Sequence, residues 1–444
     1  MITLFRQLYL SSRFFAILAM TTFFFVLSYF FPAIFLATQW LCIGLFAVLL
    51  LDIWLLFRTK ESMFGLRHTP EKLSNGDANP LQIYLENRSG IDFSLKIIDE
   101  TPIQFQLRDL LFEESLKAGQ KKTLQYHLRP IERGEYQFGA LNVFAQTALG
   151  LASRRFRFSQ DKTVAVYPSF MQMYKYELIA ISNRLQEFGV KKIRKLGSSM
   201  EFEQIRNYVQ GDDYRDINWR ATARRNDLMV NQYEDEKSQS VYCLIDKGRV
   251  MKMPFEQLSL LDYAINATLV VSNIAIKKGD KAGLLSFAET PDPILSASKQ
   301  GSQMRLIQER LYREKTRFLE TDYEKVFVSV RRGIAQRSLL LLFTNFETLH
   351  GLNRQLPYLR RLAKHHLLVV IFFENTELRQ LLDTAANDLE TVYQKTIAEK
   401  FNYEKRQIVK ELQAHGILAM LTDPHRLIID TINKYLEIKA RRLL

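Results

Sequence analysis

Residues 203–246 read EQIRNYVQGDDYRDINWRATARRNDLMVNQYEDEKSQSVYCLID, and this stretch joins two kinds of sequence. Its first part is dense in charged, aromatic and turn residues, whereas its last seven residues, SVYCLID, form an apolar run that ends in Asp246. A short, almost continuous apolar run is typical of a strand that is buried on both faces of a parallel sheet. We therefore expect Asp246 to lie at the carboxyl end of the first strand of a C-terminal domain.

Apolar and amphipathic runs alternate from Asp246 to the C-terminus. The runs expected to be strands are KAGLLSF at 281–287, SLLLLFTN at 338–345, HLLVVIFF at 366–373 and GILAML at 416–421. Those expected to be helices are 255–277, 302–313, 323–336, 352–364, about 387–415, and the chain from 424 onward. This alternation predicts an α/β fold, a Rossmann-type and mostly parallel sheet with helices on both faces. Ligands in such sheets bind at the carboxyl ends of the strands, where we expect Asp246, Ser286, Asn345 and Glu374.

The N-terminal part contains an apolar run, residues 14–57, with a single charged residue, Asp52. The run is about twice as long as one membrane-spanning helix needs, and Pro32 interrupts it. We therefore expect an anchor at 1–60, with transmembrane helices at about 14–30 and 33–57, in which Asp52 is close enough to the end of its helix to reach the membrane surface.

Arginine and lysine residues flank this helix pair but are absent from the turn inside it. The positive-inside rule then places both flanks, and with them the soluble domains, in the cytoplasm. The predicted location is the bacterial inner membrane, with a multi-pass anchor.

Residues 61–170 consist of short alternating runs, such as LQIYLEN at 81–87, that turn residues separate from one another. Period-two alternation at this spacing predicts an all-β sandwich of immunoglobulin-like kind. Residues 171–200 are expected to form a helical connector, and 201–444 hold the quoted stretch and the α/β domain.

The composition narrows the classes of function. A formal net charge of +13 suits an anionic partner or a membrane surface. The chain has two cysteines and contains no CxxC, HExxH, GxSxG or P-loop motif. It also lacks a basic motif interleaved with aromatic residues, so nucleic acid is not an expected partner. These features exclude a disulfide framework and indicate no familiar catalytic site.

The order of polar residues in the α/β region resembles that of a von Willebrand factor A domain. In that family a D-x-S-x-S motif, a distant threonine and a further aspartate bind a divalent cation through oxygen atoms. Asp246 matches the first position and Thr321 the threonine, but Gly248 and Val250 replace the two serines, and Asn345 stands where the aspartate would be. The resemblance therefore implies a degenerate metal-ion-dependent adhesion site, with no cofactor beyond a weakly bound Mg²⁺.

The turn Gly211-Asp212-Asp213 is expected to begin a helix, because an aspartate caps free amide groups and suits a helix N-terminus. Three hypotheses remain open for the segment that follows. We favour a buried network of ion pairs and caps that docks the segment on the sheet. The others are an exposed recognition surface and a two-carboxylate catalytic or metal site. The residues concerned are Asp212, Asp213, Arg215, Trp219, Arg220 and Arg224.

The same segment carries the pattern Tyr208-x-x-Gly211-Asp212-Asp213-x-Arg215-x-Ile217-x-Trp219-Arg220, followed by Ala223-Arg224 and an acidic run at 234–236. This pattern closely resembles the signature of the domain-of-unknown-function family fifty-eight. The resemblance implies a paired N-terminal membrane span, a β-rich region and a von Willebrand A-like domain. Genes of that family commonly lie beside a gene for a MoxR-type AAA+ ATPase, so the resemblance also implies such an ATPase, or its client, as the partner in a chaperone-like module.

These observations favour a non-catalytic adaptor or scaffold that is anchored in the lipid bilayer and binds a MoxR-type ATPase or its client. The alternative is a metal-dependent hydrolase that uses Asp212, Asp213 and Asp246. The hydrolase hypothesis requires these three carboxylates to converge.

Overall fold

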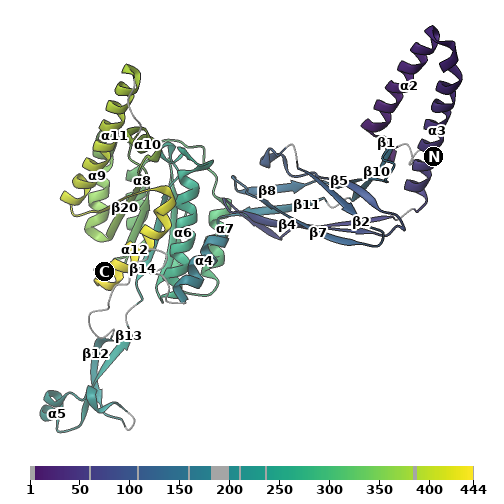
Figure 1. Cartoon of the computed structure of the whole chain (residues 1–444). Helices are drawn as coiled ribbons and strands as arrows, with labels where there is room; N and C mark the ends of the chain where they lie inside the picture. The colour runs from purple at the N-terminus through teal and green to yellow at the C-terminus, as the bar shows by residue number, and fades with distance from the viewer. Residues whose placement is uncertain are drawn as a thin grey trace. The chain divides into compact units, whose positions relative to one another are not determined.

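The computed structural model describes residues 6–59, 62–107, 110–158, 161–181, 200–209, 212–235, 238–383 and 388–443 (Figure 1). The chain divides into two compact units, Met1–Tyr167 and Pro168–Leu444. The division lies close to residue 170, where the sequence predicts a change from the β-rich region to the connector. Most of the predicted connector, residues 182–199, lies outside the described residues.

Two apolar helices open the N-terminal unit. They are α2 (Ser12–Phe30) and α3 (Phe35–Phe57), joined by the 3-10 turn η1 (Pro32–Ile34). Ser11 caps α2, since its hydroxyl accepts a hydrogen bond from the backbone N–H of Phe14. Both helices are long and apolar enough to cross a membrane. The two predicted helices and the break at Pro32 are therefore confirmed.

The rest of the N-terminal unit is rich in β-strands. Its strands are β1 (Leu8–Leu10), β2 (Met63–His68), β3 (Lys72–Ser74), β4 (Asn79–Asn87), β5 (Phe93–Asp99), β6 (Leu111–Leu116), β7 (Lys121–Leu128), β8 (Gly134–Phe138), β9 (Leu141–Gln146), β10 (Ala152–Phe158) and β11 (Lys162–Tyr167). They form the sheets β1-β10-β9-β5-β6, β2-β4-β7 and β3-β11-β8, and all pairs are antiparallel except β3 with β11. Alternate residues of β5, such as Phe93, Leu95 and Ile97, point into a core that the sheets share.

Asp52 ties α3 to this β-rich region. Its side chain is completely buried, and it accepts hydrogen bonds from the hydroxyl of Thr147 and from the backbone N–H groups of Leu151 (2.9 Å) and Ala152 (2.8 Å). Arg154 of β10 donates to the carbonyl oxygen of Leu56 at 3.0 Å. Asp52 is thus engaged by the loop before β10, and its position relative to the membrane surface stays a prediction.

The C-terminal unit is built on a six-stranded sheet. Its strands are β14 (Ser240–Asp246), β17 (Lys281–Phe287), β18 (Leu295–Ser298), β19 (Leu339–Phe343), β20 (Leu367–Phe373) and β21 (Leu418–Thr422). Their order is β18-β17-β14-β19-β20-β21, which is the doubly wound order 3-2-1-4-5-6. The β17–β18 pair is antiparallel and the other pairs are parallel, so the sheet is mixed. The five expected strands are confirmed, while the sequence analysis missed β18.

Helices cover both faces of this sheet. They are α4 (Phe170–Ile181), α6 (Leu260–Lys277), α7 (Gln303–Arg313), α8 (Tyr323–Gly333), α9 (Leu349–His365), α10 (Thr376–Asp383), α11 (Leu389–Ala414) and α12 (Leu427–Ala440). One core joins α6, α7 and α12 to one face, through side chains such as Cys243, and the other joins α8, α9 and α11 to the opposite face, through Leu244. This arrangement explains why the strands are apolar on both sides.

Residues 200–235 form a separate hairpin, which we call the arm (Figure 1). Its strands β12 (Met200–Asn207) and β13 (Met229–Asp235) pair with each other in a two-stranded sheet. Between them lie the 3-10 turn η4 (Tyr214–Asp216) and the short helix α5 (Trp219–Arg225). The focal stretch of the sequence is thus an antiparallel hairpin with a helical tip.

Candidate functional site

Asp246 ends β14 at the point where the strand order reverses, between β14 and β19. Only 1% of its surface is exposed. Its Oδ1 accepts hydrogen bonds from the hydroxyl of Thr321 (2.6 Å) and the backbone N–H of Gly248 (2.8 Å), and its Oδ2 accepts from the hydroxyls of Thr344 (2.7 Å) and Tyr323 (3.1 Å). We call this group the Asp246 corner; it contains one carboxylate and four donors.

The electrostatics of the Asp246 corner follow from its burial. Burial raises the pKa of the Asp246 carboxyl, and the hydrogen bonds that it accepts oppose this rise. Burial, together with the neighbouring carboxylate, raises the pKa of Tyr323 well above its usual value. Tyr323 therefore stays a neutral hydroxyl that donates to Asp246, and its oxygen lies 2.8 Å from the hydroxyl oxygen of Thr344.

Gly248 explains why the first serine of the metal-binding motif is missing. A Cβ atom at this position would lie 2.0 Å from the hydroxyl oxygen of Thr321 and 2.9 Å from Oδ1 of Asp246. The backbone thus approaches Thr321 too closely for any larger residue. Asp246 and Thr321 do lie together, yet they contact each other directly, in the space that a shared cation would need.

Asn345, the third residue of the expected cation site, does not donate to Asp246. Its side-chain N–H donates to the carbonyl oxygen of Val250 at 3.4 Å, and its Oδ1 accepts from the ammonium of Lys405 at 2.6 Å. Asp246 is thus one carboxylate among hydroxyl groups. In the described part of the chain, no group of three or more His, Cys, Asp or Glu side chains could hold a metal ion. These residues do not fit a divalent cation site of the usual kind.

Lys247, next to Asp246, belongs to a second buried cluster. Its ammonium donates to Asp292 (2.5 Å) and Glu314 (2.9 Å), and Ser286 at the end of β17 donates to both carboxylates. Burial lowers the pKa of Lys247, but the hydrogen bonds with Asp292 and Glu314 outweigh it, so the net pKa is raised. This cluster uses its charges internally and has the character of a structural ion-pair network.

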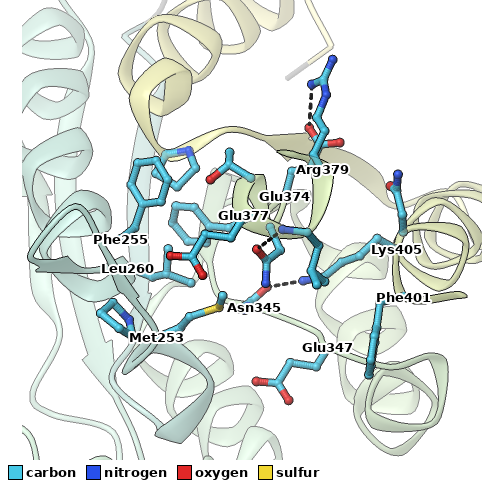
Figure 2. A pocket seen from close by; sticks show the side chains of 17 residues that line it. Met253, Phe255, Leu260, Asn345, Glu347, Glu374, Glu377, Arg379, Phe401 and Lys405 are labelled. Carbon is cyan, nitrogen blue, oxygen red and sulfur yellow. Dashed lines mark hydrogen bonds and ion pairs between the residues drawn. The ribbon is translucent and has the colours of Figure 1, made fainter. Parts of the chain in front are cut away.

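A pocket of about 290 Å³ lies at the carboxyl ends of β19 and β20 (Figure 2). Figure 2 shows Met253, Phe255 and Leu260 on one side of the pocket and Phe401 and Lys405 on the other, with Asn345 between them. The pocket is also lined by Pro254, Glu347, Phe373, Glu374, Asn375, Thr376, Glu377, Leu378, Arg379, Asn402 and Pro424. The expected position of Asn345 and Glu374 at a ligand-binding edge of the sheet thus coincides with an open cavity.

Lys405 is the most unusual residue of this pocket. It is only 9% exposed, and burial lowers the pKa of its ammonium to about 8, an effect that Glu347 partly opposes. Its neighbours are a neutral amide oxygen and the ring of Phe372, whose centroid lies 5.6 Å away. Glu374 is held by Arg379 at 3.6 Å.

The arm places the remaining predicted residues differently from expectation. Arg206, which the sequence analysis did not single out, donates to both oxygens of Asp212, at 2.8 and 2.7 Å, and lowers the pKa of that carboxyl. Asp213 caps η4 by accepting from the N–H of Arg215, which confirms the predicted helix start. Gly211 lies outside the described residues.

The expected buried network at the tip of the arm is wrong. Trp219 is 68% exposed, and the side chains of Arg215, Arg220 and Arg224 are also exposed. Only Asp212, paired with Arg206, is half-buried. Of the three hypotheses for this segment, the exposure of these side chains favours the recognition surface.

Several residues that shape these sites gave no signal in the sequence. Lys405 lies in a long amphipathic region where a lysine is expected to face solvent. Tyr323 lies two residues after Thr321 and Thr344 directly before Asn345, but hydroxyls at the ends of elements are too common to attract attention. The position of Thr344 directly after an apolar strand was the one usable signal.

Comparison with known proteins supports the resemblance. Residues 204–415 match the model of a family described as "Protein of unknown function DUF58". The chain is similar to the uncharacterized protein YeaD of Bacillus subtilis (strain 168), at 31% identity over 170 residues, 38% of this chain and 39% of that protein. The chain thus spans about two fifths of the length of the curated relative that it matches.

Among solved structures, two domains match about a quarter of this chain. One is PapD-like domain 7 of human CEP192, at 12% identity and a TM-score of 0.18, covering 24% of this chain and 87% of that domain. The other is the CARDB domain of PF1109 from Pyrococcus furiosus, at 15% identity and a TM-score of 0.18, covering 23% of this chain and 86% of that domain. Likenesses this low carry no argument about fold or function.

Proposed function

We propose that this chain is a membrane-anchored, non-catalytic adaptor whose arm binds a partner protein. The observation that carries the proposal is the exposed cluster of arginine and aromatic side chains at the tip of the arm. Tyr214 and Trp219 are 69% and 68% exposed, and Arg215 lies over the ring of Tyr214, with 5.7 Å between the guanidinium carbon and the ring centroid. Tryptophan, tyrosine and arginine are the residue types that dominate binding hot spots.

The backbone of the tip is held by other residues. The side chain of Asn218 accepts from the N–H of Ala221 (3.0 Å) and donates to Asn231 (2.7 Å), while the hydroxyl of Thr222 accepts from the N–H of Met229 (3.0 Å). Asn226 ends α5 in the left-handed conformation. Because these contacts fix the tip, Trp219 and the exposed arginines have no evident role in folding, which favours a role in recognition.

The partner class is an inference from the family resemblance: a MoxR-type AAA+ ATPase or its client, acting with this chain in a chaperone-like module. In this proposal, α2 and α3 anchor the chain in the bacterial inner membrane, and the flanking arginine and lysine residues keep both soluble regions in the cytoplasm. The β-rich region acts as an immunoglobulin-like spacer, and the C-terminal unit as a von Willebrand A-like domain. The order 3-2-1-4-5-6 with an antiparallel edge strand supports the latter.

The hydrolase alternative receives no support from the geometry. Both oxygens of Asp212 accept from Arg206, and both oxygens of Asp246 accept from buried donors. A general base or a metal ligand needs a free lone pair directed at the substrate or the metal. The carboxylates of Asp212 and Asp246 are therefore already engaged.

The adaptor proposal is tested by affinity purification of the full chain from detergent-solubilised membranes. We expect an identified AAA+ ATPase or envelope protein to copurify with the wild type and to be lost with Trp219→Ala or Arg220→Ala. Tyr393→Ala on α11 and Arg332→Ala on α8 are matched controls, because both side chains are exposed outside the arm. Retention of the partner by both arm variants, or no such partner in any sample, contradicts the proposal.

A further inference from the structure

The pocket beside Lys405 has the features of a ligand site that the adaptor proposal does not use. It opens at the carboxyl edge of the parallel strands, where Asn345 follows β19 and Glu374 follows β20. Doubly wound sheets bind ligands at this edge. Its volume of about 290 Å³ suits a small molecule or one end of a peptide.

The charge at the base of the pocket is incompletely paired. A lysine ammonium has three N–H donors, and the described structure pairs that of Lys405 with one oxygen, Oδ1 of Asn345, at 2.6 Å. No described carboxylate lies within 4.0 Å of this ammonium. Glu374, which also lines the pocket, forms its ion pair with Arg379. A cation that is nine-tenths buried and faces a cavity calls for an anion.

The side-chain amide of Asn345, the neutral partner of Lys405, does not replace a carboxylate. The amide N–H of Asn345 points to the carbonyl oxygen of Val250 at 3.4 Å, and this contact turns Oδ1 toward Lys405. Asn345 thus positions the ammonium while leaving it without a carboxylate within 4.0 Å among the described residues. A ligand carboxylate bound there would accept from the remaining N–H groups of Lys405.

The walls of the pocket select the rest of the ligand. Met253, Phe255, Leu260 and Phe401 are apolar and line its sides. Glu347 and Glu377 also line it and disfavour a second negative charge on the ligand. The lining is therefore suited to a molecule with one carboxylate and an apolar body.

We propose that this pocket binds an apolar monocarboxylate, either a free small acid or the C-terminal carboxylate of a peptide, whose charged end pairs with Lys405. Lys405 then acts as a binding residue and Asn345 as its positioning residue. The competing explanation for the burial of Lys405 is that it only links α11 to the loop after β19. In that case a carboxylic acid and the corresponding amide would bind in the pocket equally well.

The binding has a defined pH dependence. Burial lowers the pKa of Lys405 to about 8, and a bound carboxylate raises it again. The other charged residues that line the pocket are Glu347 after β19, Glu374 after β20, and Glu377 and Arg379 on α10, and Glu347 opposes the lowering of the Lys405 pKa. Because the carboxylate prefers the protonated amine, its affinity is constant between about pH 6 and 8, where both groups are charged, and decreases by up to about tenfold per pH unit above pH 8.

The experiment measures binding of hexanoate to the full chain in lipid nanodiscs by calorimetry, with empty nanodiscs subtracted. Hexanamide probes the need for the charge, and N-acetyl-Leu-Leu, as acid and as amide, probes a peptide terminus. We expect the acids to bind at least tenfold more tightly than the amides. Binding of the free acid alone, or of the peptide acid alone, identifies the source of the carboxylate, and either result supports the proposal.

Three variants complete the test. Lys405→Met, which keeps the side-chain length, is expected to weaken acid binding at least tenfold, whereas Lys410→Met, at an exposed position of α11, leaves it unchanged. Glu347→Gln is expected to strengthen acid binding severalfold, because it removes a negative charge from the pocket. Equal binding of acid and amide, unchanged binding in Lys405→Met, or no binding of any probe overturns the proposal.

Discussion

The Asp246 corner and the Lys405 pocket lie at the same edge of one sheet, and each contains a buried charged side chain. The carboxylate of Asp246 has four protein donors, two for each oxygen. The ammonium of Lys405 has one neutral acceptor and faces a cavity of about 290 Å³. The protein therefore supplies all the hydrogen-bond partners of the Asp246 carboxylate, but only some of those that the Lys405 ammonium could bind.

This difference separates a residue that shapes the fold from one that is free to bind. A buried charge that has all its hydrogen bonds offers nothing to a ligand, and disrupting it leaves its partners unpaired. A buried charge without a counter-ion lowers stability until a ligand arrives, which is common at functional sites. The resemblance to metal-binding domains draws attention to Asp246, but the physical chemistry of this chain points to Lys405.

The largest effect is expected from Asp246→Ala. Loss of the carboxylate leaves the buried hydroxyls of Thr321, Tyr323 and Thr344 without their acceptor, which we expect to lower the free energy of unfolding by about 2–4 kcal/mol. Denaturation of the purified chain with and without Mg²⁺ measures this. Asp246→Asn keeps one acceptor oxygen and is expected to cost less than half as much. An Asp246→Ala variant of wild-type stability, or a wild type that Mg²⁺ stabilises strongly, contradicts the closed corner.

Gly248→Ser is expected to have the next largest effect, although it restores the residue of the metal-binding motif. Its Cβ would meet the hydroxyl of Thr321 at 2.0 Å, so the corner must open, at a cost of roughly 1–3 kcal/mol. Thermal unfolding of the chain measures the loss. The double variant Gly248→Ser with Thr321→Gly removes the clashing hydroxyl and is expected to lose less than the sum of the two single changes. Full additivity would show that the contact has no role.

The smallest effect, and one of opposite sign, is expected from Lys405→Met. The pKa of Lys405 is about 8 in the folded chain, below the ordinary value of 10.5, so between these values the unfolded chain binds more protons. The contribution of Lys405 to stability is therefore unfavourable below pH 8 and disappears as the pH rises toward 10.5. We expect the variant to be more stable than the wild type by about 1–2 kcal/mol at pH 7 and equally stable near pH 10.5. Comparing unfolding midpoints across this range measures the effect, and a destabilised variant at pH 7 contradicts it.

The sequence predicts the regular elements of the C-terminal unit well, because strands such as LLLLF at 339–343 are buried on both faces and contain no polar residues. It misses β18 (LSAS) and β10 (ASRRFRF), since edge strands and strands with charged residues do not stand out as apolar runs. The pairing of Asp246 with Thr321 could be inferred from the resemblance alone, because the two residues are 75 positions apart.

Burial of single side chains is harder to predict than the elements that carry them. The tip of the arm, with Trp219 and the neighbouring arginines, was expected to dock on the sheet through a buried network of ion pairs and caps. They lie instead on a hairpin that pairs with itself. Lys405 is buried, although a lysine in an amphipathic helix usually faces solvent. Its depth depends on how α10 and α11 fold over the ends of the strands, and a local sequence pattern does not contain that information.

The link between Asp52 and the loop before β10 has a consequence for how the chain is made. Leu151 lies 99 positions after Asp52, and a ribosome adds about 5–20 residues per second, so the carboxylate is synthesised roughly 5–20 s before its partners. Until then the carboxylate has none of these partners and must be solvated by water. The strand β1, which precedes both helices, likewise waits for β10 to be translated. β1 is therefore made well before the strand that pairs with it.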